Sequence, residues 1–216
     1  MEAHSARPPI EPEPATWQPR VMWASGRLLA GAITFFFISF VFAYFYLKSL
    51  DLNHNWRIGS HVHPSIGLGI GIIVSLLVSA ALLRVASRRP LAQMPAGPQT
   101  ELMALGAVAL ALLSIALQCI SYTVQKFGPA SGGYASVYVG WTVFYIFIML
   151  APIYWITTQY ATLRRRRREG KAWAEQEAVV YASELELMGA GLESCAFFWS
   201  YYVFIGLVAF VVLYLV

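Results

Sequence analysis

Three histidines lie close together in one short segment, where they could bind a metal ion. His54, His61 and His63 belong to the stretch NHNWRIGSHVHP. An extended His-x-His pair can place both rings on one side, and a third histidine could complete a zinc or copper ligand set. Asp51 is the nearby carboxylate, and the segment contains no cysteine. We therefore expect solvated loop histidines, with a metal site as the alternative.

A glycine-rich stretch, SIGLGIGIIVSLLVSAALL at residues 65–83, raises the question of a phosphate-binding loop. Such a loop needs a preceding strand, the GxGxxG or GxxxxGK[ST] spacing and an exposed helix start. Here the apolar run continues without a charge and contains no lysine. Small residues recur every four positions, at Gly67, Gly71, Ser75 and Ser79, which places them on one face of a helix. This pattern predicts a ladder of small residues for close helix packing in a membrane.

A later segment carries a comparable row of small and polar residues. We predict that the two faces pack together, because small side chains permit close van der Waals approach between helices in lipid. The same faces could instead contact another subunit, and the sequence leaves both alternatives open. We expect Gln118 to satisfy its amide across a helix interface. The row is spaced three and four residues apart, at Ala107, Ala111, Ser114, Gln118 and Ser121.

Three further candidates lie in or beside apolar segments. Glu193, near one end of the last segment, is the candidate functional carboxylate, and the alternative is a boundary carboxylate that reaches the lipid headgroups. Cys119 and Cys195, the two cysteines, are interpreted as small core residues. The apolar segments contain no histidine, and they contain no series of ionisable residues that would extend across the bilayer. We therefore expect no catalytic, cofactor-binding or metal-binding residue in this chain, and no pump acting alone.

The composition places all these residues in a lipid environment. Hydrophobic residues make up 58% of the chain and charged residues 12%, whereas a soluble domain has about 25% charged residues. A helix needs about 20 apolar residues to cross a bilayer. We predict an all-α, polytopic membrane bundle behind a flexible polar tail at 1–20, with aromatic residues of the first span (FFFISFVFAYFY) facing lipid or filling the bundle. The five spans are expected at about 22–47, 64–85, 102–124, 134–160 and 193–216.

Basic residues are distributed unequally between the two sides of such a bundle. All but three of the 15 Lys and Arg residues fall on one side, the exceptions being Lys48, Arg57 and Lys126. Because cytoplasmic loops carry the excess of Lys and Arg, we predict a cytoplasmic N-terminus and an extracytoplasmic C-terminus. Residues 171–191 are expected to extend the last helix or to lie at the headgroups. The arginines predicted to contact anionic phospholipid are Arg84, Arg88, Arg89, Arg164, Arg165, Arg166, Arg167 and Arg168.

The order of features along the chain is distinctive. The first span ends in FAYFY, the loop after it holds Trp56, and the second span is rich in small residues. The third span ends in LQCISYTVQ, the fourth begins YASVYVGWTVFYIFI, and the last opens FFWSYYVFIG and ends VVLYLV. Over about residues 20–216 this order resembles the subunit III family of haem–copper terminal oxidases (cytochrome c oxidase), in its five-span bacterial form.

The chain departs from that family at most of its characteristic polar positions. Gln118 and Tyr122 match near the end of the third span, and Trp199 keeps the first position of the family's Trp-His-Phe-x-Asp pattern. The resemblance is therefore to a divergent member. The family's glutamates, histidines and aspartate fall at Ile33, Ser121, Tyr145, Ile148, Ser200 and Val203.

The resemblance implies a non-catalytic structural subunit of a respiratory haem–copper oxidase in the bacterial cytoplasmic membrane. Such a subunit would stabilise the catalytic subunit I, assemble with subunit II and bind phospholipid, without contact with nucleic acid. Haem and copper would belong to those partners, which couple electron transport from cytochrome c or quinol to oxygen reduction. Two alternatives are the homologue associated with nitric oxide reduction and a small membrane transporter or lipid-handling protein.

Overall fold

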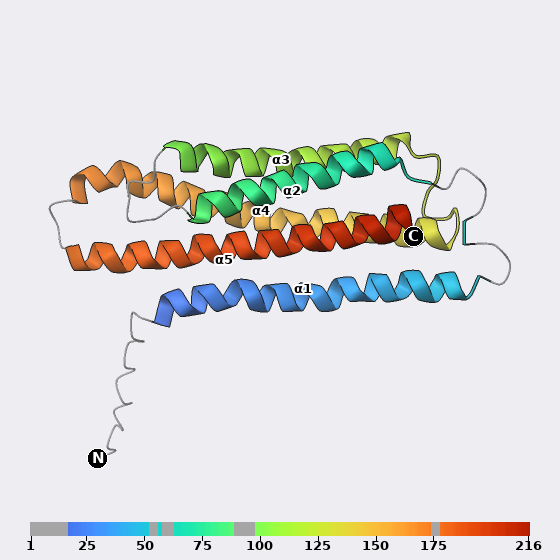
Figure 1. Cartoon of the computed structure of the whole chain (residues 1–216), viewed down its shortest axis with the longest axis horizontal. Coiled ribbons are helices and arrows are strands. Elements are labelled where there is room, and N and C mark those ends of the chain that lie inside the picture. Colours follow the sequence, from blue (N-terminus) through green and yellow to red (C-terminus); the bar gives the residue numbers. More distant parts are fainter. Residues whose placement is uncertain (1–16, 52–55, 58–62, 89–97, 174–177) are drawn as a thin grey trace, which may run out of the picture.

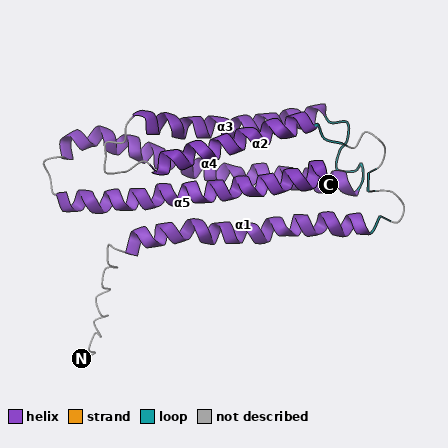
Figure 2. Cartoon of the chain, viewed as in Figure 1, coloured by secondary structure: helices purple, strands orange, loops and turns teal. Residues whose placement is uncertain are grey.

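Five long helices make up most of the chain (Figure 1). The computed structural model describes all residues except 1–16, 52–55, 58–62, 89–97 and 174–177. Every regular element in the described part is helical (Figure 2). Each long helix is apolar enough to cross a membrane, which confirms the prediction of an all-α, multi-pass membrane protein. The elements are α1 (Trp17–Ser49), α2 (Ile66–Arg88), α3 (Pro98–Val124), α4 (Gly133–Trp173), α5 (Ala178–Phe210) and the π-helical turn η2 (Val211–Leu215).

Several helices are longer than the apolar spans predicted from the sequence. α1 begins at Trp17, so the helix includes residues 17–20 of the predicted tail, while residues 1–16 lie outside the described part. Of the segment 171–191, residues 171–173 continue α4, which ends at Trp173, and residues 178–191 belong to α5, which begins at Ala178. The prediction that this segment extends the last helix is therefore confirmed for residues 178–191. An apolar window gives only the minimum length of a helix, because polar flanking residues can continue the backbone hydrogen-bond ladder.

The helices alternate in direction, so their connections gather at two ends of the bundle (Figure 1). We call one the arginine end, because the last turns of α2 carry Arg84 and Arg88 and the final part of α4 carries Arg164. We call the other the tryptophan end: there the Trp56 carbonyl accepts the Tyr134 amide of α4, and the Val216 carbonyl, at the C label of Figure 1, accepts from Lys48 of α1. α1 starts at the arginine end, and the chain finishes after η2 at the tryptophan end. The first and last described residues therefore lie at opposite ends of the bundle (Figure 1).

α5 is the central helix of the bundle. In the apolar stretch of 18 consecutive residues that marks each span, 56% of the residues are buried in the last span, formed by α5 and η2, but only 22% in α1. α5 packs against α1, α2 and α4, while α3 packs against α2 and α4. Hydrogen bonds reinforce this position: the Gly26 amide of α1 donates to Ser194 Oγ (3.1 Å), and the hydroxyls of Thr34 and Tyr201 lie 2.5 Å apart.

The aromatic residues of α1 divide between its two faces. Phe37 and Tyr44 are buried, and Phe37 packs edge-on against the ring of Tyr202. Phe35 and Phe42 are 81% and 68% exposed, as expected for side chains that meet lipid. The aromatic run therefore does both things predicted for it: one stripe fills the bundle and the other covers its outer surface.

Candidate functional site

α2, α3 and α5 meet in a dense contact that we call the Ser79 junction, made by Ser79, Ala107 and Trp199. All three side chains are fully buried. Ser79 Oγ donates to the Ala107 carbonyl (2.7 Å) and accepts a hydrogen bond from Trp199 Nε1 (3.0 Å). One hydroxyl therefore joins three helices, and the alanine lets the backbones of α2 and α3 approach closely.

The remaining ladder residues of α2 are buried to different degrees. Ser75 is buried and donates to the Ile72 carbonyl of its own helix (2.8 Å), while Gly71 is half-buried and Gly67 is exposed. The tightest approach falls instead at Gly69, where an added Cβ would lie 2.6 Å from the ring of Tyr214. The four-residue spacing missed this glycine, although GLGIG contains it, because Gly69 faces α5 rather than α3.

The matching row on α3 is buried throughout. Ala107 and Ala111 are fully buried, and Ser114, Gln118 and Ser121 are each at most 6% exposed. Gln118 Nε2 donates to the hydroxyl of Tyr138 on α4 (3.3 Å). The amide therefore finds its partner across a helix interface, as its position in the third span predicted.

Tyrosine hydroxyls extend this polar contact toward the tryptophan end. The hydroxyls of Tyr138 and Tyr214 lie 3.0 Å apart, which joins α4 to η2. The Tyr122 hydroxyl donates to Thr142 Oγ1 (2.6 Å), and Thr142 Oγ1 donates to the Tyr138 carbonyl (2.7 Å). These groups are neutral and satisfied by one another, so they fix the helices without placing a charge in the interior.

Tyr145 and Tyr202 clamp α4 to α5. Their rings are stacked, with centroids 4.5 Å apart and planes 18° apart. The Tyr145 hydroxyl donates to the Tyr202 carbonyl (3.1 Å), and the Tyr202 hydroxyl donates to the Tyr145 carbonyl. The resemblance places a histidine at the position of Tyr145. In this chain that position instead packs α4 against α5 through the stacked ring and the pair of hydrogen bonds.

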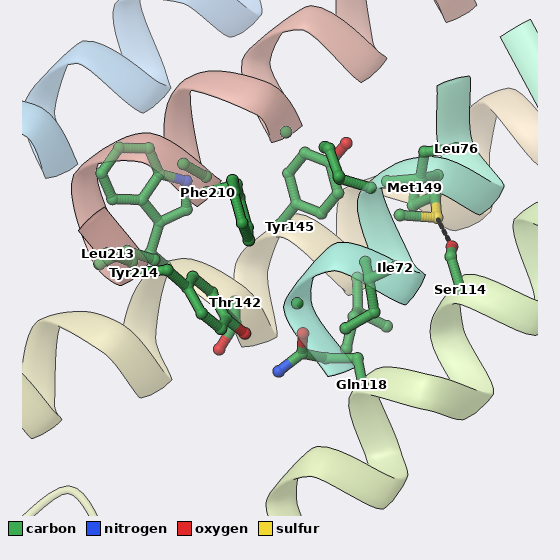
Figure 3. Close-up of a pocket in the computed structure, with 16 residues that line it drawn as sticks. Ile72, Leu76, Ser114, Gln118, Thr142, Tyr145, Met149, Phe210, Leu213 and Tyr214 are labelled. Atoms are coloured by element: carbon green, nitrogen blue, oxygen red, sulfur yellow. Dashed lines mark hydrogen bonds between the residues drawn. The ribbon is translucent and has the colours of Figure 1, made fainter. Parts of the chain in front are cut away.

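A cavity lies beside these contacts, between α2 and α3 on one side and α4, α5 and η2 on the other (Figure 3). It encloses about 520 Å³ of space not filled by atoms, including its mouth. Gln118 extends from α3 toward the wall formed by Thr142 and Tyr214, while Ile72 and Met149 contribute apolar surface (Figure 3). Trp141 also lines the cavity, and its buried Nε1 has no hydrogen-bond partner among the described residues.

The arginine end carries a second, smaller cavity and several basic side chains. The cavity holds about 380 Å³ of unfilled space between Leu83, Ile156, Leu192 and other residues. Arg84, on the same helix as Leu83, is half-buried. The other predicted lipid-contact arginines are divided: Arg88, Arg164 and Arg165 are exposed, Arg89 lies outside the described residues, and the side chains of Arg166, Arg167 and Arg168 are not described.

Glu193 and the cysteines occupy different surroundings from one another. Glu193 is exposed, while the next residue, Ser194, is fully buried against α1. Cys195 is buried as predicted, but Cys119 is exposed, so the interpretation of Cys119 as a core residue is wrong. It follows Gln118 directly, and adjacent helical residues point about 100° apart, which turns Cys119 toward the outer surface.

Among the predicted loop histidines, His63 is exposed, and His54 and His61 lie outside the described residues. No group of three metal-ligating side chains is present within the described part of the chain. The predicted metal alternative therefore gains no support from the one histidine that can be placed.

Trp56 and Arg57 form a contact that the sequence reasoning missed. Trp56 is buried, its ring lies edge-on to Tyr44 and Tyr134, and its carbonyl accepts the Tyr134 amide (3.0 Å). The Arg57 guanidinium lies 4.4 Å from the Tyr134 ring centroid. Gly132, with a φ of 120°, makes the turn that begins α4. The sequence did offer one indication of this contact: a large apolar side chain, Trp56, in an otherwise polar loop. Its packing covers the tryptophan end of the bundle between α1 and α4.

Comparison with known proteins does not assign this chain to a family. No protein-family model matches the chain, and no curated protein matches it. Its function must therefore be argued from its own residues, their arrangement and the resemblance in the order of its sequence features.

Proposed function

We propose that this chain is a non-catalytic, subunit III-like structural subunit of a respiratory haem–copper oxidase in the bacterial cytoplasmic membrane. Its role would be to stabilise the catalytic subunit I, next to subunit II, and to hold phospholipid against the complex. Haem and copper would belong to those partners, and this chain would supply contact surface and a rigid bundle.

One observation carries the proposal: a tryptophan that matches the family's pattern lies at the centre of the bundle. FFWSYYVFIG lies in α5, and its Trp199 and Tyr202 are fully buried. Trp199, the position kept from the family's pattern, joins α5 to Ser79 on α2. The resemblance therefore lies in residues that hold this fold together, as expected of a subunit whose contribution is structural.

The arginine end supports a lipid contact and an orientation. Arg84 and Arg88 on α2 share that end with Arg164 on α4, and basic residues beside apolar helices attract anionic lipid. We place the arginine end in the cytoplasm, because Lys and Arg accumulate there. Cysteines introduced at the exposed positions Ala130 and Thr162, in a background lacking both native cysteines, should differ in labelling: an impermeant maleimide added outside should label only Ala130→Cys.

Purification of the native complex tests the main proposal. A tagged chain extracted in mild detergent should carry other subunits in fixed ratio and show haem absorption that co-elutes with it. A colourless chain that elutes alone would contradict the proposal, and solute flux into liposomes containing the chain alone would favour the transporter alternative. A haem-containing complex that reduces nitric oxide but not oxygen would support the other homologue of the same family.

A further inference from the structure

Arg27 is held at the surface of α1 by two aromatic rings. Its guanidinium carbon lies 3.1 Å from the ring centroid of Trp23 and 4.6 Å from that of Phe197 on α5. Its Nη1 donates to the Trp23 carbonyl (3.0 Å) in an exposed hydrogen bond. These partners of Arg27 among the described residues are all uncharged. A guanidinium has several further N–H donors, so the side chain is fixed in place and still able to bind an anion.

The position of Arg27 along α1 fits a boundary of the hydrocarbon layer. Lys48, near the other end of the same helix, is about 31 Å away at a rise of 1.5 Å per residue. The hydrocarbon core of a bilayer is about 30 Å thick, so the two cations match its two surfaces. Trp23 is 43% exposed, which is typical of a tryptophan at the level of the lipid headgroups. Arg27 therefore lies at the depth of lipid phosphate groups.

The side chain of Arg27 points toward the headgroups along the outside of the helix. Cα–Cβ bonds in a helix tilt toward its N-terminus, and α1 begins at the arginine end (Figure 1). The contact with Trp23, one turn earlier, follows this direction. Toward the middle of the membrane, Leu28 and Phe35 are 75% and 81% exposed. This part of α1 therefore offers a cation at the headgroup level and apolar surface next to it for acyl chains.

The charges around Arg27 favour an anion. Arg20 is exposed on the same face, two turns earlier, and α1 contains no Asp or Glu. Glu193, four residues before Phe197 on α5, is exposed and carries the opposing charge, but the two arginines outnumber it. The lipid around an exposed apolar helix brings phosphate to this depth without a partner protein, so a lipid is the anion that the position favours.

We propose that Arg27 binds the phosphate group of an anionic phospholipid, while Trp23 and Phe197 hold the guanidinium in place. A guanidinium and a phosphate can form two parallel charge-assisted hydrogen bonds. The site would hold one lipid per chain, which distinguishes it from the general attraction of lipid to Arg84 and Arg88. The proposal rests on the placement of this chain in a membrane and does not depend on the oxidase assignment.

Native mass spectrometry of the purified full chain tests the site, because it counts single bound lipids. The chain in mild detergent is titrated with dioleoylphosphatidylglycerol, or with dioleoylphosphatidylcholine, whose choline compensates the phosphate charge. We expect the wild-type chain to bind the first phosphatidylglycerol more tightly than phosphatidylcholine. Arg27→Gln should weaken that first binding by about tenfold, since charge-assisted hydrogen bonds are lost. Trp23→Leu should weaken it by about threefold, because the guanidinium loses one supporting ring.

Three control variants separate a discrete site from the effect of net charge. Lys126→Gln removes an exposed charge at the tryptophan end and should leave the first binding unchanged. Arg88→Gln removes an exposed charge at the arginine end and should weaken the first binding less than Arg27→Gln does. Glu193→Gln removes the opposing charge and should not weaken it. If Arg27→Gln does not fold, the lipid preference of the wild-type chain and the loss in Trp23→Leu decide the question.

Several results would overturn the proposal. Equal affinity of the wild-type chain for the two lipids would show that the site does not select an anion. Equal weakening by Arg27→Gln and Arg88→Gln would show that lipid responds only to the summed charge of the arginine end. Unchanged binding in Arg27→Gln would leave Arg27 to an acidic side chain of a partner protein. Displacement of the lipid by excess ammonium phosphate would show that the site takes phosphate alone.

Discussion

The Ser79 junction and the larger cavity, which Trp141 lines, each contain a buried tryptophan indole, and the two indole N–H groups differ in their hydrogen bonding. Each has a fully buried tryptophan, but Trp199 donates its N–H to Ser79 while Trp141 leaves its N–H unpaired. The junction is filled by an alanine and a serine, whereas side chains leave unfilled space between the helices at the cavity. The Ser79 junction therefore fixes α2, α3 and α5 relative to one another, and the cavity leaves space between helices beside it.

The contrast also explains how a chain with few charges holds a defined structure in lipid. Lipid supplies no hydrophobic force that brings helices together, so close packing and interhelical hydrogen bonds must do so. Ser79 provides both at the meeting point of α2, α3 and α5. Helices held there, and by the Tyr145–Tyr202 clamp, can remain apart around the cavity without collapsing into it.

The largest effect should come from overfilling the Ser79 junction. Ala107→Leu places extra methylene groups where the side chain is fully buried between α2 and α3. We expect a loss of about 2–3 kcal/mol in the free energy of unfolding, measured by denaturation in mixed micelles. Ala116→Leu, on the exposed face of the same helix, is the control and should leave stability unchanged. Equal losses in the two variants would contradict the dense packing of the junction.

A smaller effect should distinguish the two buried indoles. Trp199→Phe removes a hydrogen bond to Ser79, whereas Trp141→Phe removes an N–H that is unpaired within the described part of the chain. Both changes lose similar ring volume, so we expect Trp199→Phe to destabilise the chain by about 1 kcal/mol more. The comparison uses the same unfolding assay in detergent. A larger loss in Trp141→Phe would show that its N–H is satisfied in solution.

A still smaller effect is expected when the cavity itself is filled. Ala209→Leu makes the same chemical change as Ala107→Leu, but at a residue that borders unfilled space. The larger side chain can enter that space, so the unfolding free energy should change by less than about 1 kcal/mol. Thermal unfolding of the two variants, measured side by side, compares the two regions directly. A loss as large as that of Ala107→Leu would mean that the cavity is closed in solution.

The sequence predicted the features that depend on hydrophobic length and helical period. The five spans follow from uninterrupted apolar runs, and the facing of Ser79 and Ala107 follows from small residues at regular spacing. The cavity and the unpaired N–H of Trp141 were not predictable in this way, because they depend on how side chains from four helices fill a shared space.

Trp56 and Gly69 show why local pattern reasoning missed parts of the site. Trp56 lies in a polar loop, and only the fold brings it between Tyr44 and Tyr134. Gly69 lies between two ladder positions, and its role depends on the ring of Tyr214 from the end of the chain. Both contacts join residues far apart in sequence, which a helical period cannot reveal.

The smallest effect in the isolated chain should come from Gly67, and it addresses the alternative that the sequence left open. Gly67 is exposed, and within 4 Å an added Cβ would meet only the hydroxyl oxygen of Ser65, at 4.0 Å. Gly67→Ala should therefore leave unfolding unchanged or raise stability by up to about 1 kcal/mol, because alanine favours the helix. Gly69→Ala should destabilise the chain, since its Cβ would press on Tyr214.

The small-residue ladder of α2 could pack only within this chain, or its outer part could contact another subunit. Repeating the Gly67→Ala substitution in the native assembly distinguishes these two alternatives. If Gly67→Ala loosens the assembly but not the isolated chain, the outer part of the ladder contacts another subunit while Ser75 and Ser79 hold the bundle. If neither preparation changes, the exposed glycine faces lipid and the ladder serves this chain alone. Retention of the other subunits through a detergent wash is the measurement, with Ala116→Leu as the control for an added side chain on the outer surface.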